Sequence, residues 1–205
     1  MGRYAEQVLP RLVNPVMDNP TVREVRVRVC ARATGRVLEL GAGSGLNLGH
    51  LPSSLTSLHQ VEPSSVARRL AEPRIRRSAV PVRHAGLDRQ RLDVPDRSFD
   101  TVLCTFTLCT IPDAAAALRG PPGARAGQTV PLRRARARAL CRCGGVAAAS
   151  GTDAATPRRG CHLTRRVDEL VAAFGLVVED MSRAYAPGQP RPFAYLYEGC
   201  ARRSG

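Results

Sequence analysis

The stretch Val37-Leu38-Glu39-Leu40-Gly41-Ala42-Gly43-Ser44-Gly45 decides the fold of this chain. Its first four residues predict a short buried strand, which the glycine cluster ends. Glycines allow a tight turn and a close approach of the backbone to a ligand, and a helix that begins after them would point N–H groups at a negative charge. A dinucleotide site would read G-x-G-x-x-G, whereas this loop reads G-x-G-x-G after an acidic residue. The spacing disfavours a Rossmann oxidoreductase, and the carboxylate of Glu39 suits a ligand that carries an ammonium group.

Strands and helices alternate on both sides of this loop. Further strands are expected at 55–61, 80–84, 99–104, 176–180 and 193–197, and helices at 4–13, 20–32, 63–70, 114–119 and 164–174. Alternating strands and helices imply a mostly parallel sheet covered on both faces, a Rossmann-like α/β three-layer sandwich.

Two more acidic residues follow the ends of predicted strands. Glu62 lies about 20 residues beyond the glycine loop, the distance at which a carboxylate reaches ribose hydroxyls in nucleotide sites. Asp88 follows the next strand and could accept a hydrogen bond from an adenine amino group. Singly, Glu39 would be structural, Glu62 a helix-start acid and Asp88 a turn residue. Together, and in this order, they predict a nucleoside site.

These segments resemble the class I S-adenosylmethionine (SAM)-dependent methyltransferases, especially the small type 11-like members. The matching stretches are 37–45, 61–63, the region of Asp88, 98–102 and 108–113. The resemblance covers residues ~1–119 and resumes near Gly160. It implies a seven-stranded sheet with an antiparallel last strand, SAM as cofactor, and methyl transfer to a small-molecule acceptor whose reacting atom stays open. Such an enzyme aligns a nucleophile with the sulfonium methyl group and excludes water, and it needs a base only if the acceptor must lose a proton.

The resemblance also implies the residues of the site. The glycine loop and Glu39 would hold the methionine end, Glu62 the ribose, the residues after the third strand the adenine, and those after the fourth strand the methyl-transfer face. His162 is the candidate to touch the acceptor, with a structural histidine as the competing interpretation. The predicted cofactor-binding residues are Glu39, Gly41, Gly43, Gly45, Asn47, Glu62, Pro63, Leu87, Asp88, Thr105 and Phe106.

Residues 120–159 depart from the family pattern, which would place a hydrophobic fifth strand here. The segment instead contains Pro131 and eight arginines against the single acid Asp153. Because proline and arginine are unfavourable in a central strand, we expect at most a short strand around Thr129-Val130. One hypothesis is that the segment is translated out of frame, since a shift of one base allows Arg-Leu-Tyr-Leu near residues 128–132. A catalytically impaired SAM-binding protein is then the alternative to an active enzyme.

Composition limits the remaining function classes. The formal net charge is +14, but all 31 basic residues are arginine, which indicates codon bias more than selection for phosphate. An Arg-rich nucleic-acid-binding module is therefore the weaker alternative. The seven cysteines form no disulfide framework, and Cys141-x-Cys143 is too tight for the usual zinc spacing, so no metal is expected. No apolar run approaches the ~18 residues of a membrane span, so we expect a cytoplasmic protein.

The expected organisation is a single domain of 205 residues. Its parts are a helical cap (1–34), a cofactor-binding half (35–119), the aberrant segment (120–159), and a C-terminal helix with a β-hairpin (160–205).

Overall fold

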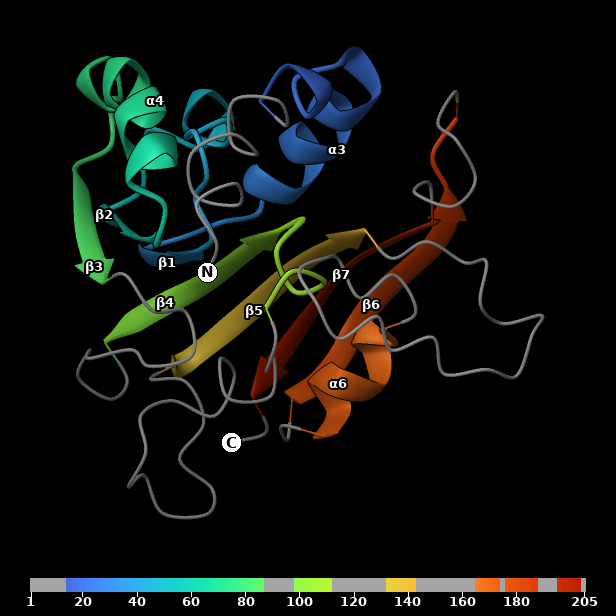
Figure 1. Ribbon diagram of the computed structural model, residues 1–205. Helices are drawn as coiled ribbons and strands as arrows, with labels where there is room; N and C mark the ends of the chain where they lie inside the picture. Colours follow the sequence, from blue (N-terminus) through green and yellow to red (C-terminus); the bar gives the residue numbers. More distant parts are fainter. Residues whose placement is uncertain are drawn as a thin grey trace.

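Figure 1 shows a computed structural model of the chain, in which residues 14–86, 98–111, 132–142, 165–173, 176–187 and 195–203 are described. The strands among these residues form one sheet in the order β3-β2-β1-β4-β5-β7-β6. The neighbouring strands from β3 through β2, β1 and β4 to β5 pair in parallel. Strand β7 pairs antiparallel with both β5 and β6. The strand bounds are β1 Arg36–Leu40, β2 Ser57–Val61, β3 Val82–Gly86, β4 Phe99–Thr105, β5 Leu132–Arg142, β6 Leu176–Tyr185 and β7 Tyr195–Arg203. The predicted Rossmann-like α/β architecture is confirmed.

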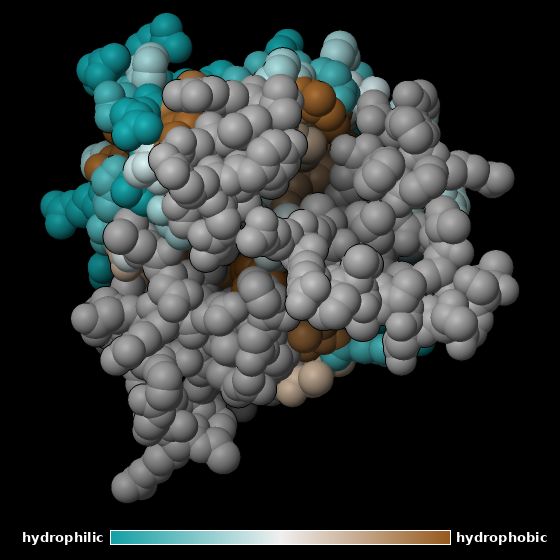
Figure 2. Space-filling view, in the orientation of Figure 1, coloured by the Kyte–Doolittle hydropathy of each residue, from teal (hydrophilic) through white to brown (hydrophobic). Residues whose placement is uncertain are grey.

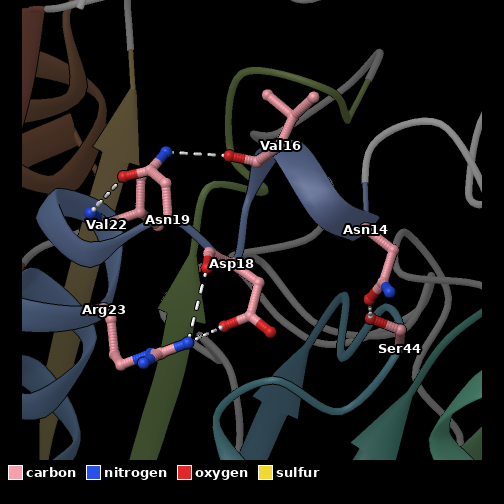
Figure 3. Close-up of polar contacts among 7 residues, drawn as sticks. All are labelled: Asn14, Val16, Asp18, Asn19, Val22, Arg23 and Ser44. Atoms are coloured by element: carbon pink, nitrogen blue, oxygen red, sulfur yellow. Dashed lines mark hydrogen bonds and ion pairs between the residues drawn. The ribbon is translucent and has the colours of Figure 1, made fainter.

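The helices begin where the sequence provides a cap. Helix α3, Pro20–Cys30, has Asn19 as its N-cap, and the Asn19 side chain accepts from the Val22 amide at 3.0 Å (Figure 3). Helix α4, Ser65–Arg76, is capped by the Ser64 hydroxyl. A short 3₁₀ turn, η1, spans Leu48–His50, and helix α6 spans Val167–Ala173. Both caps satisfy amide donors that a helix N-terminus otherwise leaves unpaired.

The core lies on both faces of the sheet, because successive residues of a strand point to opposite faces. Val37 and Leu103 pack with Val29 of α3, whereas Leu38 packs with Val167 of α6. Accordingly, α3 and α4 lie on one side of the sheet and α6 on the other (Figure 1). Hydrophilic side chains gather over the α4 side in the space-filling view (Figure 2). No helix in the described part of the chain is both long and apolar enough to cross a membrane.

Strand β5 differs from expectation. It pairs with β4 from Phe99↔Leu132 to Thr105↔Leu140, with one shift of register, and with β7 over Arg136–Arg142. The prediction of at most a short strand around Thr129-Val130 is therefore wrong, and those two residues lie outside the described ranges. The physical reasons are plain. The strand begins after Pro131, so the missing N–H lies outside the ladder, and residues 134–139 alternate arginine and alanine with the period of a strand.

Most other elements lie close to their predicted positions. Strands β1, β2, β3 and β4 and helix α3 match within two residues. Three elements are longer than predicted: α4 extends to Arg76, β6 to Tyr185 and β7 to Arg203, where the predictions ended at residues 70, 180 and 197. The predicted helices at 4–13 and 114–119 lie outside the described residues. The division of the chain into four parts stays a prediction.

Candidate functional site

The candidate site lies where the order of the sheet reverses. From β1, the chain continues to β2 on one side, and β4 then pairs with the other side of β1. In open α/β sheets, ligands bind in the crevice outside the carboxyl ends of the strands at such a switch point. The glycine loop that leaves β1 occupies this position.

The three glycines of the loop differ in what a side chain at each position would contact. Gly41, Gly43 and Gly45 have φ values of 71°, 57° and 76°, in the left-handed region that other residues rarely adopt. A Cβ atom on Gly41 would lie 2.4 Å from Thr107 Cγ2, and one on Gly45 would lie 2.9 Å from Leu48 Cδ1. A Cβ atom on Gly43 would meet no atom of the described residues within 4 Å. Gly41 and Gly45 are thus constrained by packing, whereas the backbone at Gly43 borders open space that a ligand could fill.

Glu62 faces this open part of the loop. The residue is only 7% exposed, and its Oε2 accepts from the Gly43 amide at 2.9 Å while its Oε1 accepts from the Ser64 amide at 2.8 Å. These two bonds fix the orientation of the carboxylate. Each carboxylate oxygen retains a second lone pair, so Glu62 can also accept from ligand hydroxyls.

Glu39 is enclosed. It is 0% exposed, its Oε1 accepts from Asn47 Nδ2 at 2.5 Å, and its Oε2 accepts from Gln60 Nε2 at 2.8 Å. Burial raises the pKa of Glu39, while the bonds from Gln60 and Asn47 and the positive charge of Arg26 act in the opposite direction. This geometry does not offer the expected direct contact between Glu39 and a ligand ammonium group, because both carboxylate oxygens are held inside the protein.

Asn47 connects Glu39 to a buried arginine. The Asn47 Oδ1 accepts from Arg26 Nη1 at 2.6 Å, and its Nδ2 donates to Thr105 Oγ1 at 2.8 Å as well as to Glu39. Arg26 Nη1 also donates to Thr105 Oγ1 at 3.3 Å, and its guanidinium carbon lies 5.0 Å from the centroid of the Phe106 ring. Burial lowers the pKa of Arg26, and the charge of Glu39 opposes that shift.

Phe106 marks the end of β4 with a strained backbone. Its φ of 56° is the one positive value for a non-glycine residue in the described part of the chain. Left-handed backbone costs an L-residue about 1–2 kcal/mol, and such strain often accompanies functional sites. The Thr107 hydroxyl donates to the Thr105 carbonyl at 2.9 Å and so helps to hold the turn.

The loop is also tied to the residues before α3. Figure 3 shows the Ser44 hydroxyl bonded to the side chain of Asn14. Nearby, Arg23 of α3 pairs with Asp18 at 3.0 Å. Asn14, which precedes α3, therefore contacts one side of the loop.

The structure brings together most of the predicted site. The residues that meet at the ends of β1, β2 and β4 are Glu39, Gly41, Gly43, Asn47, Glu62, Thr105 and Phe106. Gly45 supports the loop through packing, and the Pro63 carbonyl accepts from Arg68 at 3.0 Å. The remaining predicted residues, Leu87, Asp88 and His162, lie outside the described residues.

Sequence reasoning missed Arg26 and Gln60. The signal for Arg26 was present, because it belongs to the buried stripe of α3 together with Val22, Val25 and Val29. A charged residue on the core-facing stripe of an amphipathic helix requires a polar partner inside the protein.

A family model described as a methyltransferase domain matches residues 4–120, more than half of the chain. The chain belongs to the class I SAM-dependent methyltransferase family. The resemblance read from the glycine loop is thereby confirmed.

Solved structures share the fold at low sequence identity. The magnesium protoporphyrin IX methyltransferase from Synechocystis, solved with bound S-adenosylhomocysteine (SAH), superposes with a TM-score of 0.69 at 13% identity, covering 98% of this chain and 97% of its own. A putative methyltransferase in complex with the Trm112 methyltransferase activator of Haloferax volcanii gives 0.71 at 14% identity, with coverage of 100% and 99%. A SAM-dependent methyltransferase from Aquifex aeolicus gives 0.63 at 13%, with coverage of 95% and 98%. These likenesses concern the fold.

Proposed function

We propose that this methyltransferase domain binds SAM at the carboxyl ends of β1 and β2 and transfers its methyl group to a small-molecule acceptor. The observation that carries the proposal is the pair formed by Gly43 and Glu62. The Gly43 backbone borders open space, and a buried carboxylate is bonded to its amide at 2.9 Å. A nucleoside ligand needs both features, a close approach to the backbone and an acceptor for ribose hydroxyls.

The residues present fit the cofactor. Glu62 would hold the ribose hydroxyls, the loop at Gly43 would pass along the ligand, and Thr105 and Phe106 would border the reacting end. We also propose that Leu87 and Asp88 contact the adenine and that His162 lies near the acceptor. SAM supplies an activated methyl group when bound. The chain's own residues bind it, orient it and keep water away from it, which are the main contributions that such a displacement requires.

The distribution of charge supports a small acceptor over a nucleic acid. Many of the described arginines pair with carboxylates, so fewer of them are isolated cations open to phosphate, although the net charge of the chain stays +14. The arginines in these pairs are Arg23, Arg28, Arg32, Arg76, Arg166, Arg183 and Arg202. Among the fold relatives, the Synechocystis enzyme is named for a small-molecule substrate, magnesium protoporphyrin IX.

Calorimetry with SAH and SAM tests the cofactor half of the proposal. We expect saturable binding of both ligands by the full chain, and absence of binding by a chain that melts cooperatively would overturn the proposal. Transfer of a labelled methyl group is then followed in two arms, one with a pool of small metabolites and one with total RNA and protein. Label in the small-molecule arm supports the acceptor class, and label confined to the macromolecular arm overturns it. Binding without transfer to either arm identifies the catalytically impaired alternative.

A further inference from the structure

We infer that Arg26 binds the carboxylate at the amino-acid end of the cofactor, and that Asn47 and Glu39 are its positioning residues. This inference rests on the proposed function. It gives Glu39 a role that differs from the sequence-based prediction, because Glu39 would orient a cation inside the protein where that prediction had it meet the ligand's ammonium group.

The first support is that Arg26 is buried and has no direct counter-ion among the described residues. The residue is 7% exposed, and the two hydrogen bonds of its Nη1 go to neutral acceptors, the Asn47 amide oxygen and the Thr105 hydroxyl. Its Nε atom has no hydrogen-bond partner among the described residues. Within those residues, no carboxylate lies at ion-pair distance from Arg26. A buried charge left unpaired costs several kcal/mol, and an anionic ligand would reduce that cost.

The second support is the position of the guanidinium group. Arg26 extends from α3 to Thr105 at the end of β4 and to Asn47 just after the glycine loop. It also lies over the ring of Phe106, the strained residue that follows β4. Arg26 is therefore at the same switch point as the glycine loop and Glu62. A guanidinium group presents donors in a planar fork that matches the two oxygens of a carboxylate.

The third support is the way in which Glu39 is kept apart from Arg26. Asn47 stands between them, since its Nδ2 donates to Glu39 and its Oδ1 accepts from Arg26. The second oxygen of Glu39 is occupied by Gln60. Glu39 can thus orient Arg26 through Asn47 without forming the ion pair that would saturate the guanidinium group. The arrangement holds the guanidinium group of Arg26 in place and leaves some of its N–H donors for the carboxylate of a ligand.

Two ligands that differ only at the amino-acid end separate this role from a structural one. SAH carries the carboxylate, whereas 5′-methylthioadenosine retains the nucleoside and the sulfur but lacks that end. For Arg26→Gln we expect SAH to bind about 10- to 100-fold more weakly, the scale of a hydrogen bond to a charged group. We expect 5′-methylthioadenosine to bind within about 3-fold of its original affinity, because it makes no carboxylate contact.

Arg28→Gln is the matched control, because Arg28 lies on the same helix, is exposed and bonds Glu198. It should leave both affinities unchanged. Equal weakening of both ligands by Arg26→Gln, or no weakening of either, would overturn the assignment of Arg26.

Two further measurements keep the inference testable if Arg26→Gln fails to fold. Arg26→Lys retains the charge and should bind SAH with intermediate affinity. In the unaltered chain, the carboxamide analogue of SAH should bind more weakly than SAH, and equal affinities would overturn the inference. If the unaltered chain binds no SAH at all, the proposed function fails. If it binds SAH and Arg26→Gln changes nothing, only this inference fails.

Discussion

Strands β1 and β5 flank the same strand, β4, and both pair with it in parallel, but their sequences are of opposite kinds. In β1, the four residues from Val37 to Leu40 are fully buried. In β5, five of the eleven residues are arginine. Pairing needs only backbone N–H and C=O groups, which every residue except proline provides in full. The stability of a central strand comes instead from burying apolar surface, which β1 does and for which the sequence of β5 is poorly suited.

The two regions also differ in what they contribute to the site. Every described residue of the candidate site belongs to β1, β2, β4, α3 or the segments that leave them. Changes in the glycine-loop half should therefore affect cofactor binding, whereas changes in residues 120–159 should affect mainly the free energy of unfolding.

The largest expected effect concerns residues 120–159. In the test variant, residues 120–159 are replaced by the residues that the shifted reading frame of the gene encodes. This variant should have an apolar fifth strand. It should gain several kcal/mol in the free energy of unfolding, a large part of the ~5–15 kcal/mol of a typical domain. Thermal melts of the two chains and the nucleotide sequence of the gene provide the check. Equal stability of the two chains would show that the arginine-rich strand is as good as an apolar one and would remove the frameshift hypothesis.

The next largest effect concerns Gly43. Gly43→Val should abolish SAH binding, because its side chain would fill the space beside the loop and its φ of 57° strains any residue with a Cβ. Calorimetry measures the binding, and a thermal melt confirms that the variant is folded. Gly49→Val is the matched control, since a Cβ there also meets no described atom within 4 Å and that residue is exposed. Unchanged affinity of the Gly43 variant would place the ligand elsewhere.

Glu62→Ala should have a smaller effect. The loss of a charged acceptor for the ribose hydroxyls should cost about 2–3 kcal/mol of SAH binding. A 2′,3′-dideoxy analogue of SAH should lose much less, since it has no hydroxyls to offer. If both ligands weaken equally, Glu62 acts only by holding the Gly43 and Ser64 amides, and the ribose contact is wrong.

The smallest effect concerns the ion pairs that join the segment around α3 to the C-terminal strands. Arg28 of α3 forms an exposed pair with Glu198 of β7, and Arg32, in the turn after α3, forms one with Asp180 of β6. Exposed pairs contribute about 0.2–1 kcal/mol, so Glu198→Gln should lower the free energy of unfolding by no more than that and leave SAH affinity unchanged. Denaturant unfolding at low and high salt measures it, and a loss well above this range would show that α3 depends on the C-terminal strands.

Local patterns predicted those parts of the molecule that depend on near neighbours in the sequence. The strand at 37–40, the glycine turn and the start of the helix near residue 63 each need only a short run of residues with the right conformational preferences. The place of Glu62 beside the loop could be predicted because a parallel sheet brings the carboxyl ends of its strands to one edge, and its role toward a ribose stays a prediction. The resemblance to methyltransferases then connected these pieces to SAM.

Other features depend on which segments pack together, and no local pattern contains that information. The bond from Arg26 to Thr105 joins residues 79 positions apart, and Glu39 is enclosed only because Asn47 and Gln60 approach it from two different segments. The position of β5 likewise follows from backbone hydrogen bonds to β4 and β7. These bonds join main-chain groups, so they form whether the side chains of β5 are arginine or apolar. Sequence alone predicted the glycine turn that follows β1 and the nucleoside site proposed beside it. Tertiary packing decided that an arginine would be buried beside that loop, because a buried charge acquires its partners only when distant segments meet.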